Sequence, residues 1–177
     1  RILQETLRNL YDGMPAADID KALIISARSL VEHDPQYTYA TARFLLRTLY
    51  AEALHFLELP LHTHRHSGIY SHYFQHYIKR GIQLELLDPQ LHTFDLEQLS
   101  QALLPERDQQ FTYLGLQTLY DRYFLHADHI RFELPQAFFM RVAMGLAQHE
   151  SNKNDRAIEF YHLLSSFDYM ASTPTLF

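Results

Sequence analysis

The 177-residue sequence contains no cysteine and no tryptophan. Without cysteine, this chain can form no disulfide, no thiolate metal site and no cysteine nucleophile. Glycine (5 residues) and proline (7 residues) are also scarce, which leaves few positions for irregular loops and favours helices. No run of 18 apolar residues occurs, so we expect no membrane span.

Positive charge is in deficit, and the formal net charge is −6. This balance argues against binding a nucleic-acid polymer, because such binding depends on basic side chains that neutralise phosphates. A mononucleotide needs only a few well-placed donors and stays possible. The chain starts at Arg1 and does not resemble a signal peptide, so we expect it to begin inside a longer product.

Apolar residues are plentiful, at 47% of the chain, and they recur at helical spacing. A weak alternation between Tyr123 and Phe132 predicts one short hairpin. We therefore predict an all-α, mainly helical fold with orthogonal helices. The predicted helices cover residues 2–11, 18–31, 38–57, 69–87, 95–104, 112–120, 135–147 and 154–170.

The helix that begins at Pro135 should lie at the centre of the core. Between Phe138 and Ala147 its only strongly polar side chain is Arg141, and a helix that is apolar on nearly every side cannot face water. Proline suits the first turn of a helix, where its missing N–H has no partner to lose. After the next helix, Ser172-Thr173-Pro174 ends helical structure, and we expect a strand to begin there.

Several polar residues mark predicted helix ends. Asp12-Gly13 ends the first helix, because glycine accepts the left-handed cap conformation. Asp18, Thr38 and Thr112 are predicted N-caps, and Asp95-Leu96-Glu97-Gln98 fits a capping box.

Histidines form the most conspicuous cluster of candidate metal ligands: His62, His64, His66, His72 and His76. His72 and His76 are four residues apart, so both rings could meet one metal ion on a helix face. However, no acidic residue lies between Pro60 and Ile78, and we favour exposed imidazoles on a loop and a helix. Phosphate-binding glycine motifs and the G-x-S-x-G nucleophile motif are absent.

Other polar candidates have ordinary structural explanations. Asp12-Gly13 and Asp18-Ile19-Asp20 look like turn and capping residues rather than a catalytic dyad. Arg43 looks like an arginine at the rim of the protein whose aliphatic stem packs on neighbouring residues. In Thr173-Pro174-Thr175, a threonine hydroxyl and a backbone N–H lie at an element boundary and suit a phosphate oxygen. Threonines also gather at boundaries simply to cap them, and residue chemistry alone favours that interpretation.

Four stretches resemble the all-helical N-terminal domain of the large (alpha) subunit of class I ribonucleotide reductase: Phe111–Leu114, Tyr123–Leu125, Glu133–Ala143 and Ser172–Phe177. Three earlier stretches resemble the helical end of that family's ATP-cone: Leu10–Gly13, Asp18–Asp20 and Tyr37–Leu46. The similarity runs in order along essentially the whole chain.

The resemblance implies a division into three parts. Residues 1–60 would be a partial, degenerate ATP-cone, residues 61–110 a helical connector, and residues 111–177 the all-alpha domain. That domain would lead into a ten-stranded α/β barrel that holds the active-site cysteines. The present chain would therefore contain no catalytic residue and be inactive alone.

The resemblance also implies an activity for the whole subunit: reduction of ribonucleoside diphosphates to deoxyribonucleoside diphosphates for DNA synthesis, in the cytoplasm. A small (beta) subunit with a metal would supply the radical, thioredoxin or glutaredoxin would restore the thiols, and nucleotide effectors would regulate a homodimer. No cofactor or metal is expected in this chain. The alternative is a non-enzymatic helical regulatory or adaptor module.

The resemblance singles out three residues. Thr175, just after the proline of the closing motif, would contact the substrate phosphates. Ala16 and Ala51 stand where nucleotide-binding cones carry a threonine and a lysine. Neither alanine can bind a phosphate through its side chain, so control by ATP or dATP at this cone is not expected.

Overall fold

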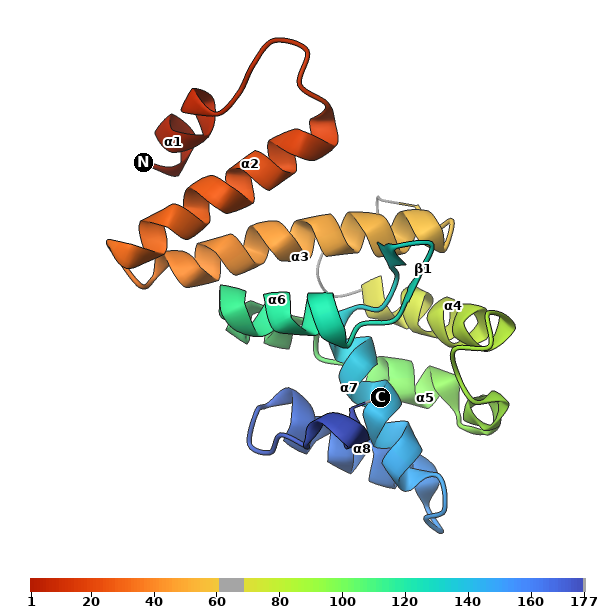
Figure 1. Ribbon diagram of the computed structural model, residues 1–177. Coiled ribbons are helices and arrows are strands. Elements are labelled where there is room, and N and C mark those ends of the chain that lie inside the picture. Colours follow the sequence, from red (N-terminus) through yellow and green to blue (C-terminus); the bar gives the residue numbers. More distant parts are fainter. Residues whose placement is uncertain (61–68, 177) are drawn as a thin grey trace.

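The computed structural model describes residues 1–60 and 69–176, with only the backbone for residues 16 and 17. Helices make up most of these ranges, as the apolar periodicity predicted (Figure 1). The α-helices are α1 (Ile2–Arg8), α2 (Ala16–Ser29), α3 (Tyr37–Phe56), α4 (Ile69–Gln83), α5 (Leu96–Gln101), α6 (Tyr113–Arg122), α7 (Pro135–Ala147) and α8 (Lys153–Ser165). Short 3-10 helices are η1 (Leu30–Glu32), η3 (Pro89–Thr93), η4 (Pro105–Gln110) and η5 (Thr173–Thr175).

The predicted hairpin is present and short. Strand β1 (His126–Ala127) pairs antiparallel with β2 (Ile130–Arg131). The two turn residues, Asp128 and His129, have φ angles of 50° and 65°, as both central residues of a type I′ turn require. In the two described ranges this is the only sheet, so the all-α prediction is confirmed.

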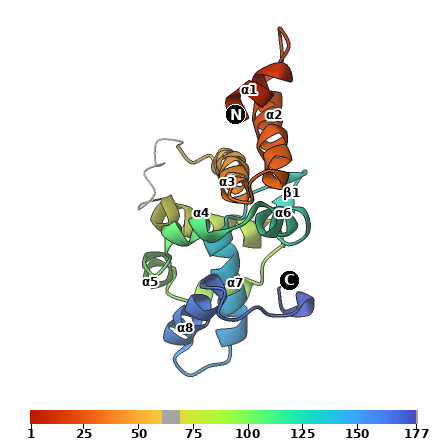
Figure 2. The same cartoon turned by 90° about the vertical axis from the view of Figure 1, so that its left-hand side faces the viewer.

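Helix α7 lies at the centre of the molecule (Figures 1 and 2). Every side chain from Pro135 to Met144 is buried, so the prediction of a central helix is confirmed. Helix α8 packs along α7, α4 packs against α5, and α6 packs against α3. The pair α1 and α2 extends from one end of the molecule and is joined to the rest mainly through α3.

Two predicted N-caps, Asp18 and Thr38, lie inside their helices instead, and those predictions are wrong. Helix α2 begins after Pro15, and Asp18 in its first turn accepts from the Lys21 ammonium at 2.9 Å. The Thr38 hydroxyl accepts from the backbone N–H of Tyr113 at 3.0 Å. Thr38 therefore links α3 to the start of α6 rather than capping its own helix.

Asp95 and Thr112 are N-caps, as predicted. The Asp95 carboxylate accepts from the Gln98 N–H at 3.0 Å, and the Thr112 hydroxyl from the Gly115 N–H at 3.4 Å. The second bond of the predicted capping box is replaced, because the Asp95 N–H donates to the Asn154 side chain at 3.0 Å. This bond fastens the start of α5 to α8.

Four of the predicted helices, 2–11, 69–87, 95–104 and 154–170, run past the observed ends of α1, α4, α5 and α8. Helix α1 stops at Arg8, and Gly13 (φ 83°) lies in the turn Tyr11–Met14 rather than capping that helix. Helices α4 and α8 each end shortly before a residue with positive φ, Glu85 (57°) and Phe167 (64°). A left-handed residue interrupts the helical path, which is why both helices are shorter than their apolar periodicity suggested.

Candidate functional site

The closing motif forms a tight turn after α8, not the strand that we expected. In η5 the Thr175 N–H donates to the Ser172 carbonyl at 3.0 Å, and the Leu176 N–H to the Thr173 carbonyl at 3.1 Å. Pro174 fits because an N–H at this point of a 3-10 turn has no partner to lose. We refer to Ser172–Leu176 as the terminal turn.

Thr175 lies at the end of η5 and is exposed. It lines a cavity of about 370 Å³ together with Arg141 and Val142 of α7 and Asp88 from the loop after α4. Within the described part of the chain its hydroxyl has no hydrogen-bond partner, so that hydroxyl is free for a ligand oxygen. The structure thus places the predicted site residue beside an arginine.

Thr173 has a different environment. Its hydroxyl lies 3.0 Å from the Tyr123 hydroxyl. Both residues line a second cavity of about 630 Å³, between α6 and the terminal turn, with largely apolar neighbours that include Leu114 and Met170. Leu114 is 74% exposed and Met170 49% exposed, so this cavity is an open apolar groove.

Arg141 connects the terminal turn to the core. Its Nε donates to Glu133 Oε1 at 2.7 Å, and its Nη2 donates to Glu133 Oε2 and to the Leu176 carbonyl, both at 3.3 Å. Burial lowers the pKa of Arg141, but the attraction of the Glu133 carboxylate outweighs burial and raises that pKa above its ordinary value. Arg141 is therefore a permanently charged group inside the core.

Glu133, just before α7, is fully buried and accepts from several donors. The Tyr77 hydroxyl donates to Oε1, and the Leu125 N–H donates to Oε2 at 2.9 Å. Burial and the Glu133 charge hold the pKa of Tyr77 well above its ordinary value, so this hydroxyl stays protonated and remains a donor. The carboxylate thereby joins α4, the hairpin and α7.

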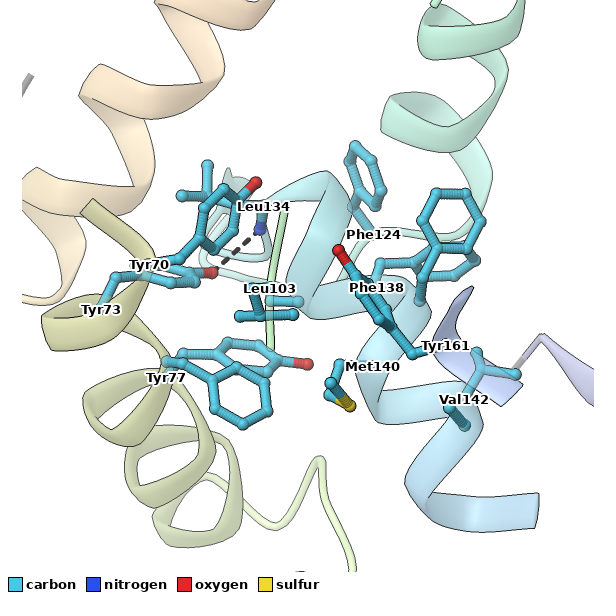
Figure 3. Packing of buried hydrophobic residues seen from close by; sticks show 14 of the residues in the cluster. Tyr70, Tyr73, Tyr77, Leu103, Phe124, Leu134, Phe138, Met140, Val142 and Tyr161 are labelled. Atoms are coloured by element: carbon cyan, nitrogen blue, oxygen red, sulfur yellow. Dashed lines mark hydrogen bonds between the residues drawn. The ribbon is translucent and has the colours of Figure 1, made fainter. Parts of the chain in front are cut away.

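Tyr73, one turn earlier on α4, holds the chain just before α7. Its hydroxyl donates to the Phe132 carbonyl at 2.5 Å. It also accepts from the Leu134 N–H at 2.9 Å (Figure 3). Both backbone groups are buried, where an unpaired polar group is costly. Burial raises the pKa of Tyr73 well above its ordinary value.

A second buried polar cluster surrounds Asp108 of η4. This carboxylate, 1% exposed, accepts from the hydroxyls of Tyr50 and Tyr70 and from the Gln136 side-chain N–H₂ at 2.7 Å. The side-chain oxygen of Gln136 accepts from the Tyr161 hydroxyl at 2.7 Å. The cluster joins α3, α4, α7 and α8, and its role is structural.

This polar interior is not apparent from the sequence. Tyr70, Tyr73 and Tyr77 lie at helical spacing within the predicted helix 69–87, and each hydroxyl makes a buried hydrogen bond that spacing does not reveal. One signal was present: Arg141 on an otherwise apolar helix requires a counter-charge when buried. Its partner Glu133 precedes it by eight residues, so the spacing of one helix face could not identify it.

The histidine cluster does not form a metal site within the described residues. His72 and His76 are exposed, and His76 Nδ1 lies 2.8 Å from the His72 carbonyl oxygen. No group of three potential metal ligands occurs in residues 1–60 and 69–176. The other members, His62, His64 and His66, lie outside the described residues.

The cone residues and Arg43 are not brought to the terminal turn. Ala51 is exposed on α3, and the side chain of Ala16 lies outside the described part. Arg43 donates to the Gln109 side chain at 3.0 Å, which agrees with the rim position predicted for it. None of the helices in the described ranges has the length and apolar content needed to cross a membrane.

Known proteins resemble this chain over almost its full length. A family model described as "Ribonucleotide reductase, all-alpha domain" matches residues 109–177. The alpha subunit of ribonucleoside-diphosphate reductase from Chlamydia trachomatis is 43% identical over 172 residues, which cover 96% of this chain and 16% of that protein. The Helicobacter pylori alpha subunit is 39% identical over 172 residues, covering 93% of this chain and 20% of that protein.

A more distant relative is the ribonucleoside-diphosphate reductase large subunit of Vaccinia virus. It is 25% identical over 186 residues, which cover 100% of this chain and 22% of that protein. The chain thus spans between about a sixth and a little over a fifth of the length of these relatives.

Proposed function

The chain belongs to the ribonucleotide reductase large-subunit family, as its N-terminal region, and we propose that the whole subunit reduces ribonucleoside diphosphates to deoxyribonucleoside diphosphates. The observation that carries this proposal is the similarity to reductase alpha subunits over more than nine-tenths of the chain. The product would serve DNA synthesis in the cytoplasm.

Within that subunit the present chain has a supporting role. It contains no cysteine and would be inactive alone, because the family's thiol chemistry needs residues beyond this chain. We propose residues 1–60 as a cone remnant, 61–110 as a connector and 111–177 as the helical domain that leads into the barrel. The exposed apolar groove beside the terminal turn would then pack on the barrel.

The remaining parts of the reaction come from partners. A small subunit would supply the radical from its metal site, and thioredoxin or glutaredoxin would reduce the active-site thiols. Nucleotide effectors would act elsewhere in a homodimer of the full subunit. The competing proposal, a non-enzymatic adaptor, predicts a gene without reductase cysteines downstream, so sequencing the continuation past Phe177 decides between the two.

Thr175 is the proposed substrate contact in this chain. Its exposed hydroxyl, without a partner in the described part, and its position in a cavity with Arg141 support a phosphate ligand. A hydroxyl donor there would position the diphosphate without taking part in the radical step.

Kinetics of the full subunit with its small subunit test this assignment. Losing one hydrogen bond to a charged group costs roughly 1.5–3 kcal/mol, so Thr175→Ala should raise KM about tenfold to a hundredfold. Thr175→Ser keeps the hydroxyl and should be much milder. Thr173→Ala, which removes only the contact with Tyr123, is the matched control. A larger KM effect at Thr173 than at Thr175 would show that the contact is assigned to the wrong threonine.

A further inference from the structure

One end of the terminal turn is hydrogen-bonded through its backbone to a buried side chain of α7. Ser172 to Thr175 are exposed, whereas the flanking residues Ala171 and Leu176 are buried. The Leu176 carbonyl, one residue after Thr175, accepts from Arg141 Nη2 at 3.3 Å. The buried Leu176 side chain and the Tyr123–Thr173 contact also hold the turn, but Arg141 supplies the hydrogen bond that ties its backbone to α7.

The guanidinium itself has little freedom. Both Glu133 oxygens accept from it, at 2.7 and 3.3 Å, and a two-point contact of this kind fixes the plane of an arginine. The guanidinium carbon, Arg141 Cζ, lies 5.3 Å from the centre of the Phe138 ring. Glu133 is in turn fixed by the Leu125 N–H and the Tyr77 hydroxyl. Each group in this series orients the next.

Stability alone is a weak reason for such an arrangement, since apolar side chains of similar volume often replace a buried ion pair without loss. The pair does, however, direct one charged donor to one backbone carbonyl of the terminal turn. We infer that Arg141, oriented by Glu133, is a positioning residue that fixes the terminal turn for binding of the substrate diphosphate. The diphosphate part rests on the proposed function, whereas the anchoring of the turn does not.

Two variants of the full-length subunit test the inference. Arg141→Lys keeps a positive charge beside Glu133, but an ammonium lacks the planar fork that reaches both the carboxylate and the Leu176 carbonyl. Glu133→Gln/Arg141→Met removes both charges together and leaves no buried charge unpaired. Any effect of this double variant therefore does not come from an uncompensated charge that unfolds the protein. In both, hydrogen exchange at the Thr175 and Leu176 amides should be faster by about tenfold or more.

Kinetics give the second readout. Because the turn would bind substrate without joining the chemical step, both variants should raise KM by about tenfold while kcat changes by less than about threefold. Tyr161→Phe is the control: it removes a buried hydroxyl bonded to Gln136, away from the turn. It should lower the melting temperature without changing KM or the exchange of the turn.

These measurements distinguish the anchoring of the turn by Arg141 from the role of the turn in substrate binding. Unchanged exchange at residues 172–176 in both variants overturns the anchoring. Faster exchange with unchanged KM overturns the role in substrate binding. A wild-type subunit that reduces no ribonucleoside diphosphate with its small subunit refutes the proposed function instead, and the exchange measurement still decides whether Arg141 anchors the turn.

Discussion

Two glycines show how differently single residues are packed in this fold. A Cβ at Gly81 of α4 would lie 2.5 Å from Leu87 Cδ1 and 2.8 Å from Leu87 Cγ. Leu87 cannot move away easily, because it is buried and its N–H donates to the Gly81 carbonyl at 3.2 Å. A Cβ at Gly145 of α7 would meet no atom within 4 Å.

Gly81→Ala should therefore destabilise the chain although alanine is the better helix former. We expect a loss of about 1–3 kcal/mol from overpacking. Gly145→Ala, the matched control, should be neutral or stabilise by up to about 1 kcal/mol. Urea unfolding of both variants measures the difference, and stabilisation by both substitutions would show that Leu87 yields without cost.

Glu52 on α3 gives a prediction about pH. Burial raises the pKa of Glu52 above its ordinary value of 4.5, although the Tyr120 hydroxyl and Arg131 act in the opposite direction. A raised pKa means that the folded state favours the protonated acid. This contribution to stability is present below the unfolded pKa and is lost as pH rises through the folded pKa.

Glu52→Gln should therefore raise the melting temperature at neutral pH, because glutamine still offers Tyr120 an acceptor without a half-buried charge. The gain should shrink as pH falls towards about 4, where the wild-type acid is protonated. Thermal unfolding between these limits is the measurement. Glu106→Gln, an exposed change on η4, should show no comparable trend with pH. If Glu52→Gln raised the melting temperature equally at neutral pH and at about pH 4, the raised pKa of Glu52 would be contradicted.

At the scale of elements, α4 and α7 depend on each other through tyrosine hydroxyls. Tyr73 supplies both a donor and an acceptor to buried backbone just before α7, and Figure 3 shows the bond from the Leu134 N–H. Tyr73→Phe keeps the ring but leaves the Phe132 carbonyl and the Leu134 N–H without this partner. We expect a loss of roughly 1–3 kcal/mol in urea unfolding. Tyr39→Phe, at a residue 37% exposed on α3, is the control and should cost little.

These two helices also show what the sequence could and could not predict. The existence of both helices follows from apolar spacing along one segment, so both were predicted, although α4 ends earlier than expected. The bonds that join α4 to the start of α7 link residues 56 to 66 positions apart, such as Tyr77 with Glu133 and Tyr70 with Gln136. No local periodicity encodes pairs so distant, and the polar interior was missed for that reason.

The prediction of a strand at the terminal turn was wrong for a different reason. Proline fixes φ near a value that both an extended strand and a 3-10 turn accept, so Pro174 alone could not distinguish them. The Leu176 carbonyl accepts from Arg141 of another helix, a contact that the local sequence could not reveal. The exposed Thr175 hydroxyl is thus predictable as a residue type, whereas its neighbours in space are not.

At the scale of the whole molecule, the projecting pair α1 and α2 lies far from the terminal turn (Figure 2). Several of its basic side chains are already engaged with nearby carboxylates. Arg8 pairs with Glu5 at 2.7 Å and Lys21 with Asp18 at 2.9 Å. Arg47 of α3 pairs with Asp20 of α2. A triphosphate would have to displace these acids, and α1 to α3 are therefore poorly prepared to bind one.

We therefore expect the 177-residue chain to bind ATP and dATP only weakly, with Kd above about 0.1 mM, where the binding free energy is roughly −5.5 kcal/mol. Calorimetric titration of dATP into the chain measures this directly. The double variant Ala16→Thr/Ala51→Lys is the informative comparison, because it restores the hydroxyl and the cation that the family resemblance assigns to nucleotide-binding cones. A gain of binding in that variant would locate the defect at these two positions. Micromolar binding by the unchanged chain would instead mean that the cone remnant still works as a nucleotide site.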